Sequence, residues 1–200
     1  MKKYILLLFI LLAGCTAIEN VSEVDIDRKF SHYEIQKIVV LAFEKSSKDE
    51  EKSESDSSRP AISPYAKNAV SDIVARELTK WGRYVVMNRR AFKEGLKLKN
   101  LKEKDVLHKG NYLDLGKTLG IDAVVAGEIE KFGVFNRALI GTLVEPMTAE
   151  ISFMVRCIDV TTNETIWSFK VDGSSKDDDE RALASKLVEK AVKTLKAEIK

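Results

Sequence analysis

The sequence is poor in the residues from which reactive and metal-binding sites are built: it has two cysteines and two histidines among 200 residues. His32 and His108 lie 76 positions apart in polar surroundings, and neither has a Cys or His neighbour at metal-ligand spacing. Cys15 and Cys157 are too few for a cysteine metal cluster. We therefore expect no metal ion and surface positions for both histidines.

The sequence also lacks an apolar run long enough to cross a bilayer, which takes about 20 residues. The run Tyr4–Leu12 has nine residues and follows two lysines. A positive start and a short apolar core are typical of a signal peptide. The run ends at Leu12-Ala13-Gly14-Cys15, which matches the bacterial lipobox. We therefore expect residues 1–14 to be removed and Cys15 to carry the lipid that anchors the chain to a membrane.

Neither sign of charge is in excess. Without Lys2 and Lys3, the 33 basic residues become 31, which equals the 31 acidic residues. A protein that binds nucleic acid usually carries a basic excess or a basic stripe. We therefore expect no nucleic-acid partner.

The mature chain divides into a tether and one domain. Residues 15–33 are mixed and polar with no sustained period, and we interpret them as a lipidated tether. Residues 34–200 form the domain, in which residues 44–60 are dominated by Ser, Lys, Asp and Glu and predict a disordered loop. Thr16 stands where enteric lipoproteins of the inner membrane carry Asp, so it favours the outer membrane, facing the periplasm.

Hydrophobic periodicity in the domain predicts a regular order of strands and helices. The predicted strands are 35–43, 84–87, 123–129, 150–160 and 165–171. The predicted helices are 64–81, with Ser63 as its N-cap, 90–98, 112–119 and 177–199. Residues 133–146 are predicted to be a link. The order β-α-β-α-α-β-β-β-α predicts an α/β domain, a mixed β-sheet with helices packed on it.

One stretch invites comparison with a phosphate-binding loop. Residues 110–118 contain two glycines followed by Lys117 and Thr118, but five residues separate the glycines where the motif has four. Lys117 and Thr118 also fall at the end of a predicted helix, where the helix dipole repels anions. We therefore expect no nucleotide.

Four further candidates have structural interpretations. Cys157 shares a strand face with apolar residues, which predicts a core position. Asp177 to Glu180 open a helix, where pairing with the helix dipole is favoured over a calcium site. Arg89 predicts an ion pair, and Asn163-Glu164-Thr165 fits a glycosylation sequon that a bacterial lipoprotein gives no reason to use. Cys15 is thus the single predicted site residue, with no catalytic residue, no cofactor and no enzyme activity.

Five stretches, taken in order, resemble the CsgG family. They are 12–15, 37–43, 69–89, 115–129 and 155–167, and the sharpest pieces read GIDAVVAGEI and CIDVTTNETIW. The family is named for the curli-secretion channel and includes the penicillin-binding-protein activator lipoproteins. The resemblance implies an α/β periplasmic domain of the anticodon-binding or TolB N-terminal type. It also implies interaction or assembly work without catalysis or a cofactor.

The curli channel is a ring whose subunits each supply two membrane hairpins, and this chain departs from that pattern. Only a short charged stretch lies between Val171 and Leu183, and residues 132–144 lack the alternation of a membrane strand. We therefore expect a lipid-anchored periplasmic protein that assists assembly or secretion of an envelope component, through envelope proteins or further copies of the chain. The alternatives are a pore subunit of the curli-channel type and an activator of a cell-wall synthase. The last must reach across the periplasm on a tether, residues 16–33, that spans at most roughly 60 Å.

Overall fold

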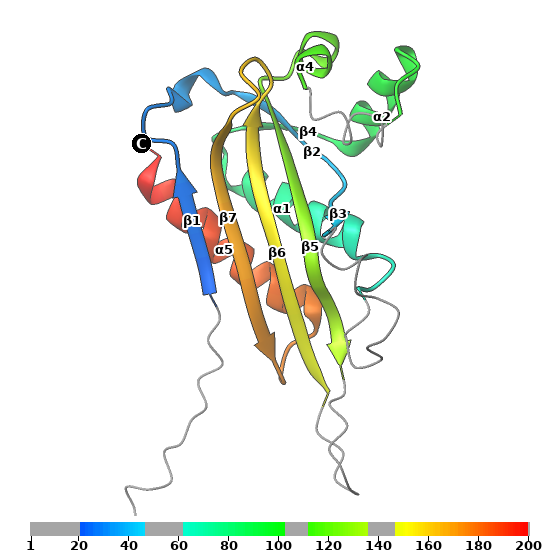
Figure 1. The fold of residues 1–200 in the computed structure, drawn as a ribbon, viewed down its shortest axis with the longest axis vertical. Coiled ribbons are helices and arrows are strands. Elements are labelled where there is room, and N and C mark those ends of the chain that lie inside the picture. The colour runs from blue at the N-terminus through cyan, green and yellow to red at the C-terminus, as the bar shows by residue number, and fades with distance from the viewer. Residues whose placement is uncertain (1–20, 47–61, 103–111, 136–146, 200) are drawn as a thin grey trace, which may run out of the picture.

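The computed structural model describes residues 21–46, 62–102, 112–135 and 147–199, which form one sheet with helices packed on it (Figure 1). Its elements are β1 (Val21–Ile26), η2 (His32–Glu34), β2 (Lys37–Val40), β3 (Glu44–Lys45), α1 (Ala66–Trp81), β4 (Val85–Met87), α2 (Arg89–Leu98), α4 (Leu113–Leu119), β5 (Ala123–Phe135), β6 (Thr148–Asp159), β7 (Thr165–Ser175) and α5 (Glu180–Glu198). Each strand and helix that periodicity predicts is present, and the predicted fold class is confirmed.

The sheet has a long antiparallel half and a short parallel half. Among the described residues it has seven strands, in the order β1-β7-β6-β5-β2-β4, with β3 paired to β5 off this path. The β1–β7, β7–β6 and β6–β5 pairs are antiparallel, whereas β2 pairs in parallel with β5 and with β4. Strands β1 and β4 therefore form the two edges of the sheet.

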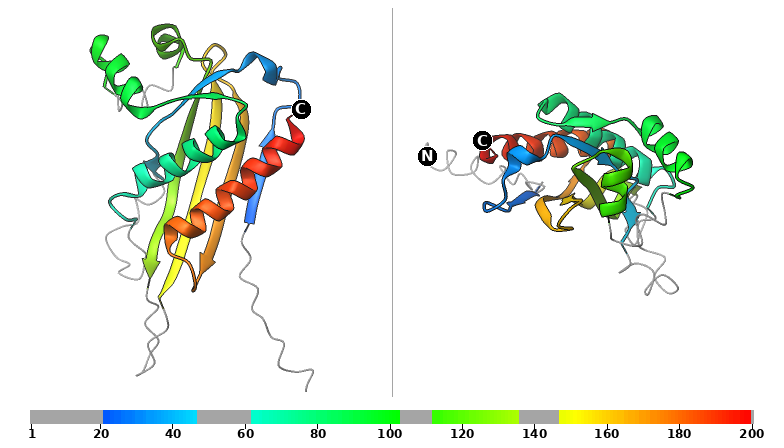
Figure 2. Two further views of the ribbon diagram at one scale, coloured as in Figure 1. Left: turned by 180° about the vertical axis from the view of Figure 1, so that it is seen from behind. Right: turned by 90° about the horizontal axis from the view of Figure 1, so that it is seen from above.

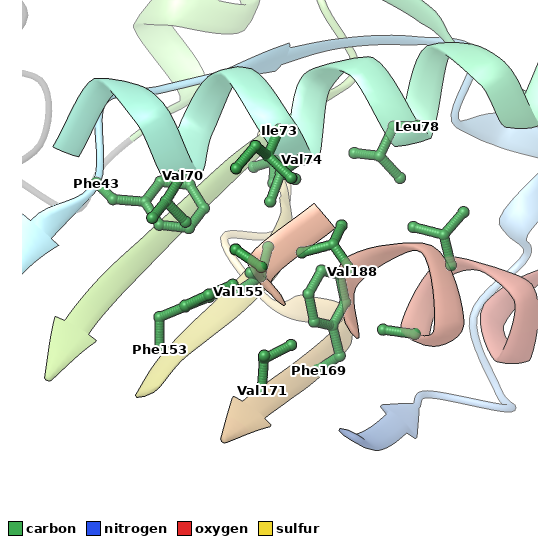
Figure 3. Packing of buried hydrophobic residues seen from close by; sticks show 14 of the residues in the cluster. Phe43, Val70, Ile73, Val74, Leu78, Phe153, Val155, Phe169, Val171 and Val188 are labelled. Carbon is green, nitrogen blue, oxygen red and sulfur yellow. The ribbon is translucent and has the colours of Figure 1, made fainter. Parts of the chain in front are cut away.

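Helices α1 and α5 cover one face of the sheet (Figure 2). Alternate strand residues point toward these helices, as the two-residue period of a strand requires. Figure 3 shows Phe153, Phe169 and Val171 packed close to Val188 of α5 and Val74 of α1, and all five are buried. Burial of each such side chain stabilises the fold by about 1.5–3 kcal/mol. Because most buried apolar residues of the domain lie in this layer, we call it the main core.

Helices α2 and α4 lie at the β2–β4 end of the sheet, in a second and smaller core (Figure 1). There Phe92, Leu96 and Leu115 pack with Val39 and Val124 of the sheet. This second core lies on the sheet face opposite α1 and α5. The rest of that face, over β5, β6, β7 and β1, carries no helix in the described part of the chain (Figure 2). We call this surface the open face; its residues are Glu23, Asp25, Glu128, Met154, Arg156 and Lys170.

Glycine ends two of the helices as local sequence signals predict, whereas the predicted N-cap of α1 is not found. Gly82 and Gly120 adopt φ of 75° and 60° directly after α1 and α4, a left-handed conformation that glycine adopts without strain. Ser63 is predicted as that N-cap, but α1 begins later, with Tyr65 as its N-cap residue and no side-chain cap bond. The Ser63 N–H instead donates to the Phe132 carbonyl oxygen over 3.0 Å, because a turn attaches this segment to β5 before the helix starts.

The predicted tether is wrong for residues 21–26, because these residues form strand β1. Ser22, Val24 and Ile26 are half-buried while Glu23 and Asp25 are exposed, which is the alternation of an edge strand. The pattern is only six residues long and is flanked by polar residues, so it does not stand out in the sequence. Of the predicted tether, residues 15–33, only residues 15–20 lie outside the described residues.

Three other boundaries also differ from expectation. Glu44 and Lys45, assigned to the disordered loop 44–60, form β3 and pair with β5, while residues 47–61 lie outside the described residues. Residues 133–135 of the predicted link belong to β5, and β7 continues to Ser175 instead of ending at Val171. Gly, Ser and Asp have low strand propensity, and here pairing with the neighbouring strand overrides it.

Candidate functional site

Cys15 lies outside the described residues, so its lipidation stays a prediction. The structure does place the point where the chain enters the fold, which is Val21 at the start of edge strand β1. In the described part of the chain, no helix has the length and apolar character that crossing a bilayer requires. Val21 is the described residue that lies nearest to Cys15 in the sequence. Its position on the sheet therefore limits how the domain can lie relative to Cys15.

Strand register shows that Val21 enters part-way along the sheet. Val21 is level with Asp172 of β7, Ser152 of β6 and Lys131 of β5. Past this row, β5 continues for four residues to Phe135, a distance of about 13 Å at the rise of an extended strand. We call this projecting part the overhang; it comprises residues 132–135, 148–151 and 173–175. Figure 1 shows it extending past the start of β1.

The overhang has a buried side and an apolar exposed rim. Phe132 and Ile151 belong to the main core, so the strands are held by packing up to this level. Beyond it, the Val134 side chain is 38% exposed, and Met147, which directly precedes β6, is 59% exposed. The Lys131 ammonium and the Glu150 carboxylate form an ion pair across the strands at 3.6 Å.

A cluster around Tyr65 ties the starts of α1 and α5 to the overhang. The Tyr65 hydroxyl donates a hydrogen bond to Oε1 of Glu180, which is buried, and this bond raises the pKa of Tyr65. The Arg181 guanidinium lies 5.8 Å from the centre of the Tyr65 ring, and the Phe132 ring packs edge-on at 6.2 Å. No sequence motif signals this cluster, because Tyr65 and Glu180 are 115 positions apart.

Cys157 is a core residue, as predicted. Its side chain is fully buried in the main core. Burial raises the pKa of the thiol well above its ordinary value, and the nearby Asp159 charge acts in the same direction. Since the thiolate is the reactive form, Cys157 behaves as a small apolar side chain and not as a nucleophile.

His32 makes contacts within its own loop. Its Nε2 donates to the Asp27 carbonyl oxygen at 2.9 Å, and its ring packs edge-on against Phe30 at 5.5 Å. His32 is half-buried rather than fully at the surface. His108 lies outside the described residues. Among the described residues, no group of three or more His, Cys, Asp or Glu side chains could hold a metal ion.

The remaining candidates lie where their structural interpretations predict. Lys117 is in the last turn of α4, away from any helix start that could hold a phosphate. Arg89 pairs with Asp72 at 3.4 Å. Asp179 caps α5 by accepting from the Ala182 N–H at 2.7 Å, and Asp178 pairs with Lys186 at 2.7 Å. The acidic stretch therefore stabilises the start of a helix.

The open face is polar and carries both signs of charge. The Arg156 guanidinium pairs with the Glu128 carboxylate at 2.8 Å, and Met154 beside them is 41% exposed. Glu23 and Asp25 add acidic groups at the β1 edge. A surface of this composition resembles the polar rim of protein interfaces more than their apolar centre.

The described residues define an α/β domain that offers a partly uncovered sheet face and two sheet edges for contacts. The chain belongs to the family of the curli production assembly/transport component CsgG, whose family model matches residues 24–198. The match confirms the resemblance to the family and covers four of the five stretches, all except 12–15. Membership supports an envelope-associated role for the chain.

The solved structures with a similar fold include a PelC dodecamer and a lipoprotein. A PelC dodecamer from Paraburkholderia phytofirmans superposes with a TM-score of 0.53 at 13% identity, over 89% of this chain and 98% of that one. Lipoprotein GNA1162 from Neisseria meningitidis gives a TM-score of 0.57 at 15% identity, over 82% of this chain and 99% of that one. At these identities the likeness concerns the fold alone. No curated protein matches the chain by sequence.

Proposed function

We propose that the chain is a lipid-anchored envelope lipoprotein, attached through Cys15, that assists assembly or secretion of an envelope component by protein–protein contacts and without catalysis. The observation that carries this proposal is a family match over residues 24–198 that begins nine positions after Cys15, the last residue of the lipobox at residues 12–15. The namesake of the family is an assembly and transport component. The short tether between Cys15 and Val21 fits a domain that works close to its membrane.

Membrane attachment is tested by Cys15→Ser in the native cell. We expect the wild-type chain to start at a lipidated Cys15 by mass spectrometry and to sediment with membranes. The Cys15→Ser chain should lose the lipid and leave the membrane fraction. Cys157→Ser is the matched control, because that thiol is fully buried and should have no part in attachment. An unmodified Cys15 in the wild-type chain would overturn the proposal.

A protein partner is tested by crosslinking from the open face. A photo-crosslinking residue in place of Met154 reports on that surface, and one in place of Leu98, which is 84% exposed on α2, reports on the other end of the domain. We expect crosslinks from living cells to other envelope proteins or to further copies of the chain. The absence of any adduct from either position would count against an assembly role.

Self-assembly into a ring is a second candidate, and it rests on the fold shared with PelC, whose crystal structure is described as a dodecamer. A pore built from the described strands is disfavoured, because Phe132, Ile151 and Val171 of these strands are committed to the helix-covered core. The mass of the detergent-extracted lipoprotein, measured by native mass spectrometry, separates a monomer from a ring. Bilayer conductance by that material would support the pore alternative.

The cell-wall-synthase alternative is weakened by β1. Six chain steps from Cys15 to Val21 span at most about 20 Å, a third of the reach expected when residues 16–33 were all taken as tether. A partner embedded in the opposite membrane would therefore have to come most of the way across the periplasm to reach this domain. The proposal accordingly places the partner next to the membrane that holds Cys15.

A further inference from the structure

From the tether length and the strand register we infer that the domain stands on the bilayer with its overhang against the lipid surface, with Val134 and Met147 at the contact. The inference rests on the proposed lipidation of Cys15. It adds to that proposal an orientation and a second point of membrane contact, made by the folded domain itself.

The first step concerns the distance from the anchor to the overhang. The tether from Cys15 to Val21 spans at most about 20 Å when fully extended. Strand β5 already projects about 13 Å past the level of Val21. With the strands pointing at the membrane, the end of β5 thus lies no more than about 7 Å from the level of Cys15. That gap is close to the length of one large side chain.

The second step excludes the inverted orientation. Thr165, the first residue of β7, lies seven residues from Asp172, which is level with Val21. Those seven residues place the opposite end of the sheet about 23 Å from Val21, measured away from the overhang. A tether of at most about 20 Å cannot bring that end to the membrane that holds Cys15.

The third step concerns the chemistry of the overhang. Val134, next to the last residue of β5, and Met147, directly before β6, are exposed apolar side chains. Exposed apolar residues also occur at the opposite end, including Val85, which is 66% exposed, so exposure alone does not select an end. The length of the tether selects the end of the domain that carries the overhang. Apolar side chains pressed against a bilayer leave water, which adds binding free energy to that of the lipid anchor.

Charge does not favour acidic lipids at this contact. Lys131 and Lys176 lie at the same end as the exposed carboxylates of Asp177 and Asp179. Mixed charge of this kind gives no net attraction to anionic headgroups, unlike a basic cluster. We therefore expect the contact to form equally well on phosphatidylcholine vesicles with and without phosphatidylglycerol.

The test uses the lipidated, signal-peptide-free protein with a single fluorophore. Cys157 is fully buried and Cys15 is proposed to be acylated, so one introduced cysteine would be the accessible thiol. Val134→Cys places the label on the overhang, Met147→Cys places it directly beside the overhang, and Val85→Cys is the matched exposed control at the other end. Each labelled protein is reconstituted in phosphatidylcholine vesicles that contain lipid with a spin-labelled headgroup, which quenches nearby fluorescence.

We expect loss of fluorescence at positions 147 and 134 and none at position 85. Quenching at 85 alone means an inverted domain, quenching at none means a domain held off the surface, and quenching at all three means a domain lying flat. Each of these three results overturns the inference while leaving lipidation of Cys15 intact. Mass spectrometry of the same samples reports that lipid separately, and its absence from Cys15 overturns both proposals.

Discussion

Gly127, in the middle of β5, is the position where the core admits no side chain. A Cβ atom there would lie 2.5 Å from the Met154 carbonyl oxygen and closer still to the Phe43 ring. The Met154 carbonyl belongs to the backbone of β6 and cannot move without disturbing the strand ladder. We therefore expect Gly127→Ala to lower the free energy of unfolding in urea by about 1–3 kcal/mol.

Gly95 provides the matched control for Gly127. Its nearest neighbour is the end of the Leu119 side chain, which can rotate away. It also lies inside helix α2, where alanine is favoured over glycine by about 0.8–1 kcal/mol. Gly95→Ala should therefore leave stability unchanged or raised. Equal losses in the two variants would contradict the assignment of Gly127 to a backbone contact.

Tyr84 makes the stability of the domain sensitive to alkaline pH. Its ring is 5% exposed and its hydroxyl accepts a hydrogen bond from Nε1 of Trp167 at 3.2 Å. Burial, the largest cause, raises the pKa of Tyr84 to about 12. The unfolded chain ionises near its ordinary pKa of about 10, so between these two values the unfolded state binds fewer protons and stability falls as pH rises.

Tyr84→Phe should be less stable than the wild type at neutral pH by about 1 kcal/mol, because the Trp167 N–H loses its acceptor. By pH 11 this difference in the free energy of unfolding should shrink by roughly 1 kcal/mol, the worth of one pKa unit, because only the wild type has a Tyr84 that ionises when the chain unfolds. Urea denaturation of both proteins at pH 7 and pH 11 measures this difference. Tyr33→Phe, at an exposed ring, controls for the loss of one tyrosine hydroxyl. A difference that stays constant would show that burial of Tyr84 does not govern its ionisation.

At the level of elements, β1 decides how much of the chain is fold and how much is tether. Val24 and Ile26 of β1 pack half-buried against the main core. A chain that begins at residue 27 loses them and leaves the β7 edge unpaired. We expect it to be less stable in urea than a chain that begins at residue 20, by at least about 2 kcal/mol from the two aliphatic side chains. If the two chains unfold at the same urea concentration, β1 is not part of the cooperative fold.

Sequence periodicity predicts the elements of the domain because their apolar faces are long. α1 and α5 each repeat apolar residues over several turns, and β6 alternates over most of its length. β1 and β3 are missed because they have six and two residues, and their strand conformation depends on partners β7 and β5 far along the chain. The full lengths of β5 and β7 are missed for the same reason: Gly133 and Gly173 carry no strand signal of their own.

At the level of the whole molecule, the candidate site has one part that the sequence can predict and one part that it cannot. Cys15 is predicted because a lipobox is a short contiguous motif. The overhang cannot be predicted, because it is defined by which residues of β1, β5 and β7 stand level with one another. Assigning residues 21–33 to the tether instead of the fold changes the tether span from about 20 Å to about 60 Å, and that difference decides which end of the domain meets the membrane.

The orientation of the molecule therefore depends on tether length, and lengthening the tether tests this dependence. Twelve added Gly and Ser residues before Val21 would make a flexible segment of about 18 residues, with a root-mean-square span of about 24 Å and a far longer maximum. The domain could then leave the surface or turn over. We expect quenching at position 147 to fall and quenching at position 85 to appear, while the lipid on Cys15 and the unfolding transition stay unchanged. If the contact made by Val134 and Met147 is strong enough to hold the domain by itself, position 147 should stay quenched whatever the tether length. That result would mean that the overhang, and not the tether, sets the orientation of the domain.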